Sequence, residues 1–262
     1  MNRIHLFEIE DLPCCPGVIR EALTDFLFGL YHLSNVYKST YGKINEILEK
    51  TGTRAIIDCC SGTGGPVLKL RNYLDTHQKK DVKITLTDKY HNLRSFEKFE
   101  KEYPETIMGI GYSVDATKIP SSLTGLRTFF SSFHHFKPED AAKILKDAVK
   151  NEAPIAIFES TQRHPVDFFL ALTSPLAVWI ILPFSKRLTF WKFVLTYIIP
   201  VIPFAFMWEY IISILRTYSL RELQALTQKI QAENYHWEFG KLKSGLRKKG
   251  VIYLTGYKKS CN

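Results

Sequence analysis

The sequence predicts an α/β protein with a mostly parallel β-sheet. Residues 54–160 alternate short β-like runs with helical patterns, which is the order expected of βαβ units. The chain has 262 residues, of which 45% are hydrophobic, so it is long and apolar enough to bury a full core. Residues 165–217 break this alternation with two long apolar runs. Together these observations exclude a disordered chain, a coiled coil and a disulfide-stabilised scaffold.

The first elements are two helices, whose apolar residues recur at helical spacing. They are expected over residues 18–32 and 41–49. Five β-like runs follow, at residues 55–58, 84–87, 108–114, 128–131 and 155–158. Helical patterns between them cover residues 65–75, 92–102 and 138–150.

A helix and two strands are expected to close the chain. Ser219 and Glu222 have the spacing of a capping box, which predicts a helix that starts there and runs to about residue 232. The runs 235–242 and 251–257, joined by a basic turn at 245–250, predict an antiparallel hairpin at a sheet edge. The predicted organisation is therefore an N-terminal helical segment (1–50), a sheet domain (51–164 and 218–262) and a hydrophobic insert (165–217).

Charge and cysteine content restrict the partners. The formal net charge is +9, and much of the excess comes from the seven Lys and Arg residues of segment 241–262, which contains no acid. No aromatic interleaving or recognition motif accompanies this patch, so a nucleic-acid partner is not expected. The five cysteines lack metal-ligand spacing, and residues 1–16 carry acids where a signal peptide needs an apolar run. Reduced thiols on the cytoplasmic side of a membrane are expected, and the oligomeric state is not predicted.

The hydrophobic insert leaves two interpretations open. Its runs 168–184 and 193–207 are uncharged, but a spanning helix needs roughly 20 apolar residues, and four prolines interrupt the segment. One interpretation is a helical hairpin that lies in or dips into a membrane, and the other is an apolar lid packed over a soluble domain. Aromatic residues at the edges, with Lys186, Arg187 and Lys192, suit an interfacial position.

Candidate chemistry lies in the turn after the first predicted strand. Asp58 is followed by a glycine-rich turn that leads into a helix, and glycines allow both a sharp turn and close approach of a ligand. Asp88 is expected at the end of the second strand and Asp115 at the end of the third. A carboxylate at such a position can accept both hydroxyls of a ribose.

These residues resemble the class I S-adenosylmethionine-dependent methyltransferases. The series Asp58-x-Cys60-x-Gly62-x-Gly64 is similar to their glycine motif, with Cys60 in place of the first glycine. The run 60–64 and the series Val114-Asp115-Ala116-x-x-x-Pro120 are similar to motifs of the quinone C-methyltransferases of menaquinone and ubiquinone biosynthesis. The resemblance covers about residues 40–160 and 218–260, outside the hydrophobic insert. It implies a Rossmann-like class I methyltransferase sheet with helices on both faces, mostly parallel with the last strand reversed.

The resemblance also implies a cofactor, S-adenosyl-L-methionine, and a set of residues that bind it. Asp58 would orient the turn or bind the amino group, and Asp88 would hold the ribose. Asp115 and Ala116 would meet the adenine. The remaining residues form the turn around the methionyl end and are Cys60, Ser61, Gly62, Thr63 and Gly64.

Candidate catalytic residues follow the fourth and fifth predicted strands. His134 and His135 come after the fourth strand, where ligands of open α/β sheets bind, and a histidine can take a proton as the methyl group arrives. Glu159 ends the fifth strand, where it would face the substrate or pair with Arg163. No metal ion is expected, because methyl transfer from a sulfonium needs chiefly alignment of the nucleophile.

The predicted function is methyl transfer to a lipophilic small molecule at a membrane. An insert next to the substrate side suggests an acceptor such as a quinone, an isoprenoid or a lipid, reached through residues 165–217. The alternative is a membrane-associated protein that binds S-adenosylmethionine for a regulatory or other non-methyltransferase role.

Overall fold

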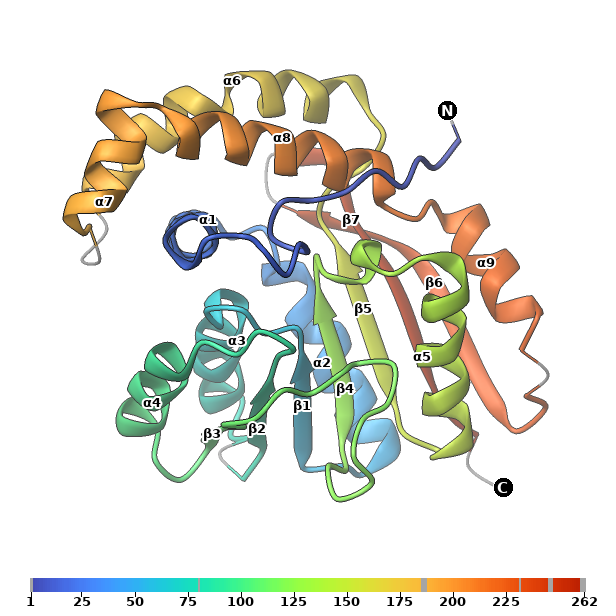
Figure 1. Ribbon diagram of the computed structural model, residues 1–262. Helices are drawn as coiled ribbons and strands as arrows, with labels where there is room; N and C mark the ends of the chain where they lie inside the picture. The colour runs from blue at the N-terminus through green and yellow to red at the C-terminus, as the bar shows by residue number, and fades with distance from the viewer. Residues whose placement is uncertain (1, 80, 185–187, 231, 245–246, 260–262) are drawn as a thin grey trace. The chain divides into compact units, whose positions relative to one another are not determined.

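The computed structural model describes residues 2–79, 81–184, 188–230, 232–244 and 247–259 (Figure 1). Contacts within the chain divide it into two compact units. Unit 1 comprises Met1–Ser34 and Thr161–Tyr218, and unit 2 comprises Asn35–Ser160 and Ser219–Asn262. Each unit is therefore built from two separate stretches of sequence.

Unit 2 contains the sheet, which has seven strands within the described residues, in the order β3-β2-β1-β4-β5-β7-β6. Neighbours from β3 to β5 are parallel, whereas β7 runs antiparallel to both β5 and β6. The predicted mostly parallel sheet with a reversed last strand is confirmed. The strands are β1 Ala55–Cys59, β2 Lys83–Thr87, β3 Ile107–Gly109, β4 Leu126–Phe130, β5 Ile155–Glu159, β6 Tyr235–Ser244 and β7 Arg247–Lys258.

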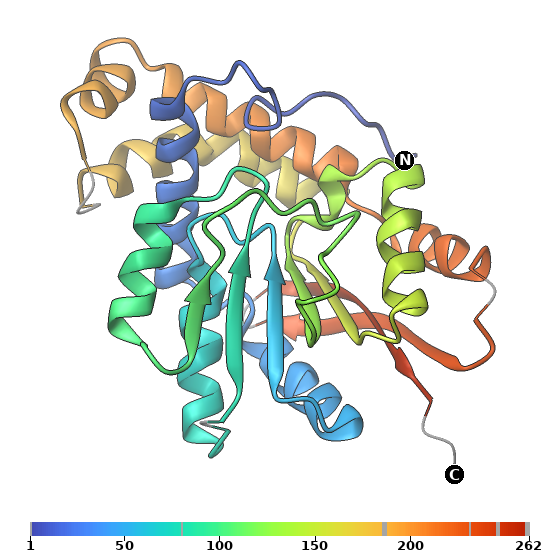
Figure 2. The ribbon, with the colours of Figure 1, turned by 60° about the horizontal axis from the view of Figure 1, so that its bottom comes forward.

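Helices lie on both faces of this sheet (Figure 2). Helix α2 packs beside α3, and α5 packs beside α9. The predicted capping box of α9 is present, since the Glu222 N–H donates to the Ser219 hydroxyl and the Ser219 N–H donates to the Glu222 carboxylate. The helices of unit 2 are α2 Lys38–Thr51, α3 Gly65–Thr76, α4 Leu93–Glu102, the 3-10 turn η1 Phe133–His135, α5 Pro138–Lys150 and α9 Leu220–Gln228.

The third strand is much shorter than the predicted run 108–114. Ile110 still donates to the Leu86 carbonyl at 2.9 Å, but the chain then leaves the sheet at Gly111. Val114 returns to donate to the Asp88 carbonyl at 3.0 Å. Glycine weakens a strand because it offers no side chain to pack, so the apolar pattern overstated this strand. The closing helix also ends earlier than predicted, at Gln228.

The closing hairpin occupies the sheet edge, as predicted. Strand β6 pairs antiparallel with β7 from Tyr235 opposite Lys258 to Ser244 opposite Arg247. Residues 245 and 246 of the predicted basic turn lie outside the described residues. This hairpin completes the sheet, because β7 also pairs with β5.

Unit 1 is helical in the part that the structure describes. Its core joins α1 to the apolar segment, through side chains such as Phe26, Val178, Ile202 and Phe206. Helices α6 and α8 pack against each other. The elements are α1 Gly17–Leu33, α6 Pro165–Ile181, the 3-10 turn η2 Leu182–Phe184, α7 Phe190–Phe193, the π-helical turn η3 Val194–Ile198 and α8 Val201–Arg216.

Lys192 does not occupy the interfacial position expected from the sequence. Its ammonium group is buried and forms an ion pair of 2.7 Å with the buried Asp25 of α1. A second acid, the exposed Glu21, lies 3.4 Å away. Sequence spacing alone could not reveal this pair, because its members are far apart in the chain. The other two basic residues of that prediction, Lys186 and Arg187, lie outside the described residues.

The described helices are short or bent relative to a membrane span. None of them alone combines the length and hydropathy needed to cross a bilayer. One pair, Phe190–Ile198 with Val201–Arg216, meets both requirements jointly, but its two halves are bent by 78°.

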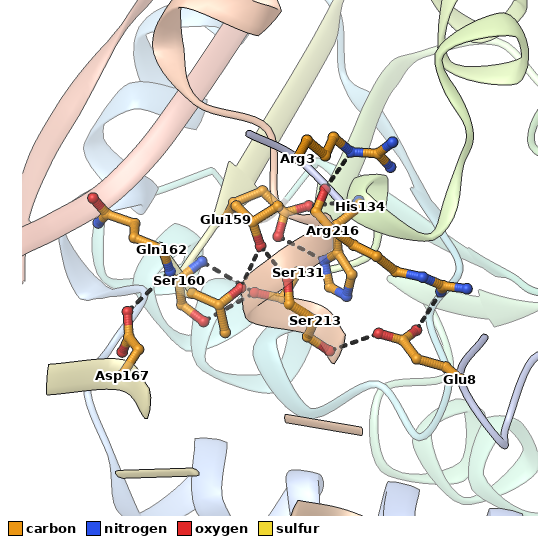
Figure 3. A network of polar contacts seen from close by, with 12 residues as sticks. Arg3, Glu8, Ser131, His134, Glu159, Ser160, Gln162, Asp167, Ser213 and Arg216 are labelled. Carbon is orange, nitrogen blue, oxygen red and sulfur yellow. Dashed lines mark hydrogen bonds and ion pairs between the residues drawn. The ribbon is translucent and has the colours of Figure 1, made fainter. Parts of the chain in front are cut away.

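The N-terminal segment lies along α8 within unit 1. The Ile4 N–H donates to the Leu215 carbonyl at 3.1 Å. The buried Arg216 guanidinium forms ion pairs with Glu8 at 2.7 Å and Asp11 at 2.6 Å. Ser213 donates to the other oxygen of Glu8, and Figure 3 shows Glu8 between these two α8 side chains. The segment is therefore held by charged contacts and not only by its backbone.

Candidate functional site

The turn between β1 and α3 has left-handed backbone at alternate positions. Gly62 has φ +53° and Gly64 has φ +71°, the conformation that favours glycine. Cys60, in place of a glycine in the motif, has φ +56°. A left-handed conformation costs a residue with a Cβ atom about 1–2 kcal/mol, so this turn carries strain at Cys60. The turn keeps the backbone shape of the motif although its first residue differs.

Gly64 is required for a second reason, which is the close approach of α4. A Cβ atom at this position would lie 2.4 Å from a ring carbon of Phe99. Phe99 is fully buried, so its ring has no free space into which to move. The turn is therefore fixed by both its own conformation and the helix packed against it.

Asp88 closes the turn from the neighbouring strand. It directly follows β2, whose Thr87 lies opposite Cys59 of β1. One carboxylate oxygen of Asp88 accepts the Gly62 N–H at 2.8 Å, and the other accepts the Tyr90 N–H at 2.8 Å. Each oxygen retains a further acceptor site, so the half-buried carboxylate can still accept ligand hydroxyls.

Asp58 lies below the turn and is buried. Its carboxylate accepts a hydrogen bond of 2.8 Å from the Thr128 hydroxyl of β4. Burial is the main cause that raises the pKa of Asp58 to about 7. Hydrogen bonds from Thr128 and Ser61 act to lower this pKa, and the negative charge of Asp88 acts to raise it. Asp58 thus links β1, the turn and β4, and its charge depends on pH near neutrality.

Asp115 and Ala116 lie in a loop and not at a strand end as predicted. The loop nevertheless reaches Asp88, because Val114 donates to the Asp88 carbonyl. Asp115 is exposed and accepts hydrogen bonds from the Thr117 hydroxyl and N–H, which outweigh partial burial and hold the pKa of Asp115 below its ordinary value. Ala116 is buried. The backbone hydrogen bond from Val114 thus holds Asp115 near Asp88 through a loop, and not through the strand that the sequence predicted.

His134 and Glu159 form a buried pair. The carboxylate of Glu159 accepts the backbone N–H of His134 at 3.0 Å and contacts its Nδ1 at 2.8 Å (Figure 3). A carboxylate can only accept, so Nδ1 carries the hydrogen and Nε2 is the basic nitrogen of the neutral ring. His135 is half-buried and stacks on His134 with ring centroids 4.5 Å apart. Glu159 therefore fixes both the orientation and the tautomer of His134.

A hydroxyl cluster beside this pair was not found from the sequence. Tyr37, at the start of α2, donates to the Ser131 hydroxyl at 2.5 Å, and the hydroxyls of Ser131 and Ser160 are 2.9 Å apart. Ser131 follows β4 with φ +44°, and such strained residues are enriched at functional sites. The sequence could have indicated Ser131 and Ser160 as site residues, because each directly follows an apolar strand, but it contained no pattern that would have indicated Tyr37.

The glycine turn, Asp88, His134 and Glu159 lie at the carboxyl ends of β1, β2, β4 and β5. Strand order reverses between β1 and β4, and ligands of open α/β sheets bind at such a switch point. The side of β1 and β2 offers a glycine turn with carboxylates, which suits a ligand with hydroxyl and amino groups. The side of β4 and β5 offers an oriented imidazole, which suits proton transfer.

Comparisons with known proteins identify the fold. No family model matches the sequence. No curated protein matches it significantly. Among solved structures, the methyltransferase domain of bacterial CtHen1-C is similar with a TM-score of 0.51 and 10% sequence identity, over 86% of this chain and 100% of that one. An O-methyltransferase family protein from Burkholderia thailandensis has a TM-score of 0.50 and 9% identity, over 86% of this chain and 57% of that one.

At these identities the likeness establishes the fold alone. The Rossmann-like sheet of class I methyltransferases, predicted from the glycine and acid motifs, is therefore confirmed.

Proposed function

We propose that the protein transfers a methyl group from S-adenosylmethionine to a lipophilic small molecule at the cytoplasmic side of a membrane. The observation that carries the proposal is the closure of the turn 60–64 onto Asp88, through the hydrogen bond from Gly62. This hydrogen bond lies where the glycine motif, its left-handed backbone and the switch point of the sheet meet. The same fold in known methyltransferases supports the activity.

The turn and its acids suit the separate parts of the cofactor. Asp88 would accept the ribose hydroxyls with its remaining acceptor sites, and Asp58 would favour the positively charged amino group. Asp115 and Ala116, held next to Asp88 by the Val114 hydrogen bond, would meet the adenine. Residues 60–64 would enclose the methionyl end, because open space beside Gly62 lets a ligand approach the backbone closely.

Proton transfer is assigned to His134, with Glu159 as its positioning residue. The bound cofactor supplies a methyl group on an already activated sulfonium leaving group. His134 Nε2 would take the proton that the acceptor loses as its oxygen or carbon gains the methyl group. Glu159 holds the imidazole through Nδ1 and stabilises the imidazolium that forms. His135, stacked on His134, is the second candidate for contact with the acceptor.

The lipophilic nature of the acceptor rests on two features. The motifs around 60–64 and 114–120 are similar to those of the quinone C-methyltransferases of menaquinone and ubiquinone biosynthesis. Helices α6 to α8 expose apolar side chains such as Phe169 and Ile180. A quinone, an isoprenoid or a lipid is therefore the acceptor class that we propose.

Calorimetric titration with S-adenosylmethionine tests the cofactor assignment. Wild-type protein should bind one equivalent, and Asp88→Ala should weaken binding by roughly tenfold or more, because hydrogen bonds to a charged group are lost. Asp81→Ala is the matched control, since the exposed Asp81 pairs with Arg54 at the surface. Unchanged affinity in Asp88→Ala, with wild-type thermal stability, would contradict the assignment.

Turnover distinguishes the two functional alternatives. Incubation with membrane lipid extract should release S-adenosylhomocysteine, and His134→Ala should slow this release without weakening cofactor binding. Binding without release would favour the alternative, a protein that uses the cofactor for a regulatory or other non-methyltransferase role.

A further inference from the structure

The helices α6, α7 and the start of α8 in unit 1 expose an unusually apolar surface. We call it the apolar face and define it by six side chains that are 57–72% exposed, which are Phe169, Leu172, Leu176, Ile180, Phe190 and Trp191. Exposed apolar residues of η3 and α8 extend it, including Ile198 and Phe204. Their summed exposed area is on the order of 1,000 Å².

The charged residues of this segment are hidden instead of exposed. Between residues 165 and 204, the charged side chains in the described part of the chain are Asp167 and Lys192, and both are buried. Asp167 accepts the N–H of Gln162 at 2.9 Å, and Lys192 pairs with Asp25 at 2.7 Å. This is the reverse of an ordinary water-facing helix, whose outer positions are polar.

Backbone groups freed by prolines are also satisfied inside the segment. Proline has no N–H, so each proline in a helix leaves the carbonyl four residues earlier without its usual donor. In α6, Pro175 removes the donor of the Ala171 carbonyl, and the Ser174 hydroxyl bonds that carbonyl at 2.7 Å. In water such a carbonyl could bind solvent, but in hydrocarbon it needs an internal partner.

Two carbonyls near further prolines of residues 165–217 also accept side-chain hydrogen bonds. Pro183 removes the usual donor of the Trp179 carbonyl, which accepts the Tyr197 hydroxyl at 2.7 Å. The Thr196 carbonyl of η3, close to the break at Pro200, accepts the Trp179 indole N–H at 2.8 Å. The polar ends of the Trp179 and Tyr197 side chains thus bond backbone carbonyls of the same segment. Hydrogen bonds are satisfied inside while the outer surface is apolar, as a lipid environment requires.

We propose that the apolar face inserts into one leaflet of a phospholipid bilayer. Helix α6 has 17 residues, about 25 Å at 1.5 Å per residue, which is short of the roughly 30 Å hydrocarbon core. The 78° bend before α8 also favours an in-plane hairpin over a spanning one.

A second copy of the chain fits the face less well than lipid. The exposed area exceeds the roughly 800 Å² per partner that a standard protein interface buries. Such interfaces are, however, only about 56–65% non-polar, whereas the described apolar face contains no exposed charge. The proposal deepens the membrane part of the proposed function, but binding to lipid does not depend on cofactor or activity.

Flotation of the full chain with phosphatidylcholine vesicles, without S-adenosylmethionine, tests the proposal. Wild-type protein should float with these neutral vesicles and remain bound at high salt, because the interaction is apolar. Leu172→Glu and Leu176→Glu should each reduce partitioning by roughly tenfold or more, since a leucine that inserts into the bilayer is replaced by a charge. Met108→Glu, at an exposed position of β3 in unit 2, is the matched control and should float like wild type.

Depth can be measured through Trp191. Phosphatidylcholine with brominated acyl chains should quench tryptophan fluorescence, and most of that quenching should disappear in Trp191→Phe. Failure of wild type to float, equal loss in Met108→Glu, or a soluble dimer that Leu172→Glu dissociates would each overturn the proposal. Because calorimetry reads the cofactor site separately, a failure here is distinguishable from a failure of the proposed function.

Discussion

Replacement of Gly64 by alanine tests whether the turn is fixed by backbone and packing together. The left-handed conformation at φ +71° should cost about 1–2 kcal/mol for a residue with a Cβ atom. The new Cβ atom would also lie 2.4 Å from the buried Phe99 ring, and such overpacking typically costs about 1–3 kcal/mol. We therefore expect Gly64→Ala to lower the free energy of unfolding by about 2–5 kcal/mol.

Gly62 provides the matched comparison, because its φ is +53° but nothing lies within 4 Å of a Cβ atom there. Gly62→Ala should cost only the backbone part, about 1–2 kcal/mol. Urea unfolding followed by circular dichroism gives both values. Adding Phe99→Leu should recover part of the loss in Gly64→Ala, as a coupling energy in a double-mutant cycle. Equal losses at both glycines, or no coupling to Phe99, would refute the packing argument.

Three other substitutions give separate checks. Asp58→Asn removes an acid whose pKa is raised by burial, so that the folded state binds its proton more tightly than the unfolded state does. As the pH rises from about 4 to about 7, the wild type should therefore lose on the order of 4 kcal/mol of stability, and the variant should not; parallel pH profiles in urea unfolding would contradict this. Cys60→Gly should raise the free energy of unfolding by about 1 kcal/mol by relieving strain, and a decrease would show that the cysteine side chain makes a compensating contact. Lys192→Met should lower the free energy of unfolding by about 3–5 kcal/mol, because it leaves Asp25 buried without its cation, and adding Asp25→Leu should restore stability. If thermal unfolding shows the single variant to be as stable as wild type, the ion pair contributes nothing to stability.

The sheet could be predicted from the sequence because its signals are local. Apolar runs of four or five residues, separated by helical patterns, identified β1, β2, β4 and β5 within a few residues. The capping box at Ser219 identified the start of α9 in the same way. Strand β3 failed because the apolar pattern of 108–114 does not reveal that the chain leaves the sheet at Gly111.

The candidate site could be predicted only where its residues share a motif. The glycine turn, Asp58 and Asp88 were found because each follows a recognisable strand. The partner of Glu159 was left open, since its bond to His134 joins residues from two strand ends 25 positions apart. Lys192 was wrongly predicted at a membrane interface for the same reason, because its buried ion-pair partner Asp25 comes from α1. Pairs of residues far apart in the chain can be identified only from the three-dimensional fold, because local sequence patterns carry no information about them.

The division of unit 1 into two stretches has a consequence for synthesis on the ribosome. Its first part ends at Ser34 and its second begins at Thr161, so α1 emerges long before α6 and α8 exist. At about 5–20 residues per second, the apolar side of α1, with Leu23 and Phe26, waits roughly ten seconds for its packing partners. During that time the nascent chain must shield this surface by other means, and neither unit can be expressed as a single continuous fragment.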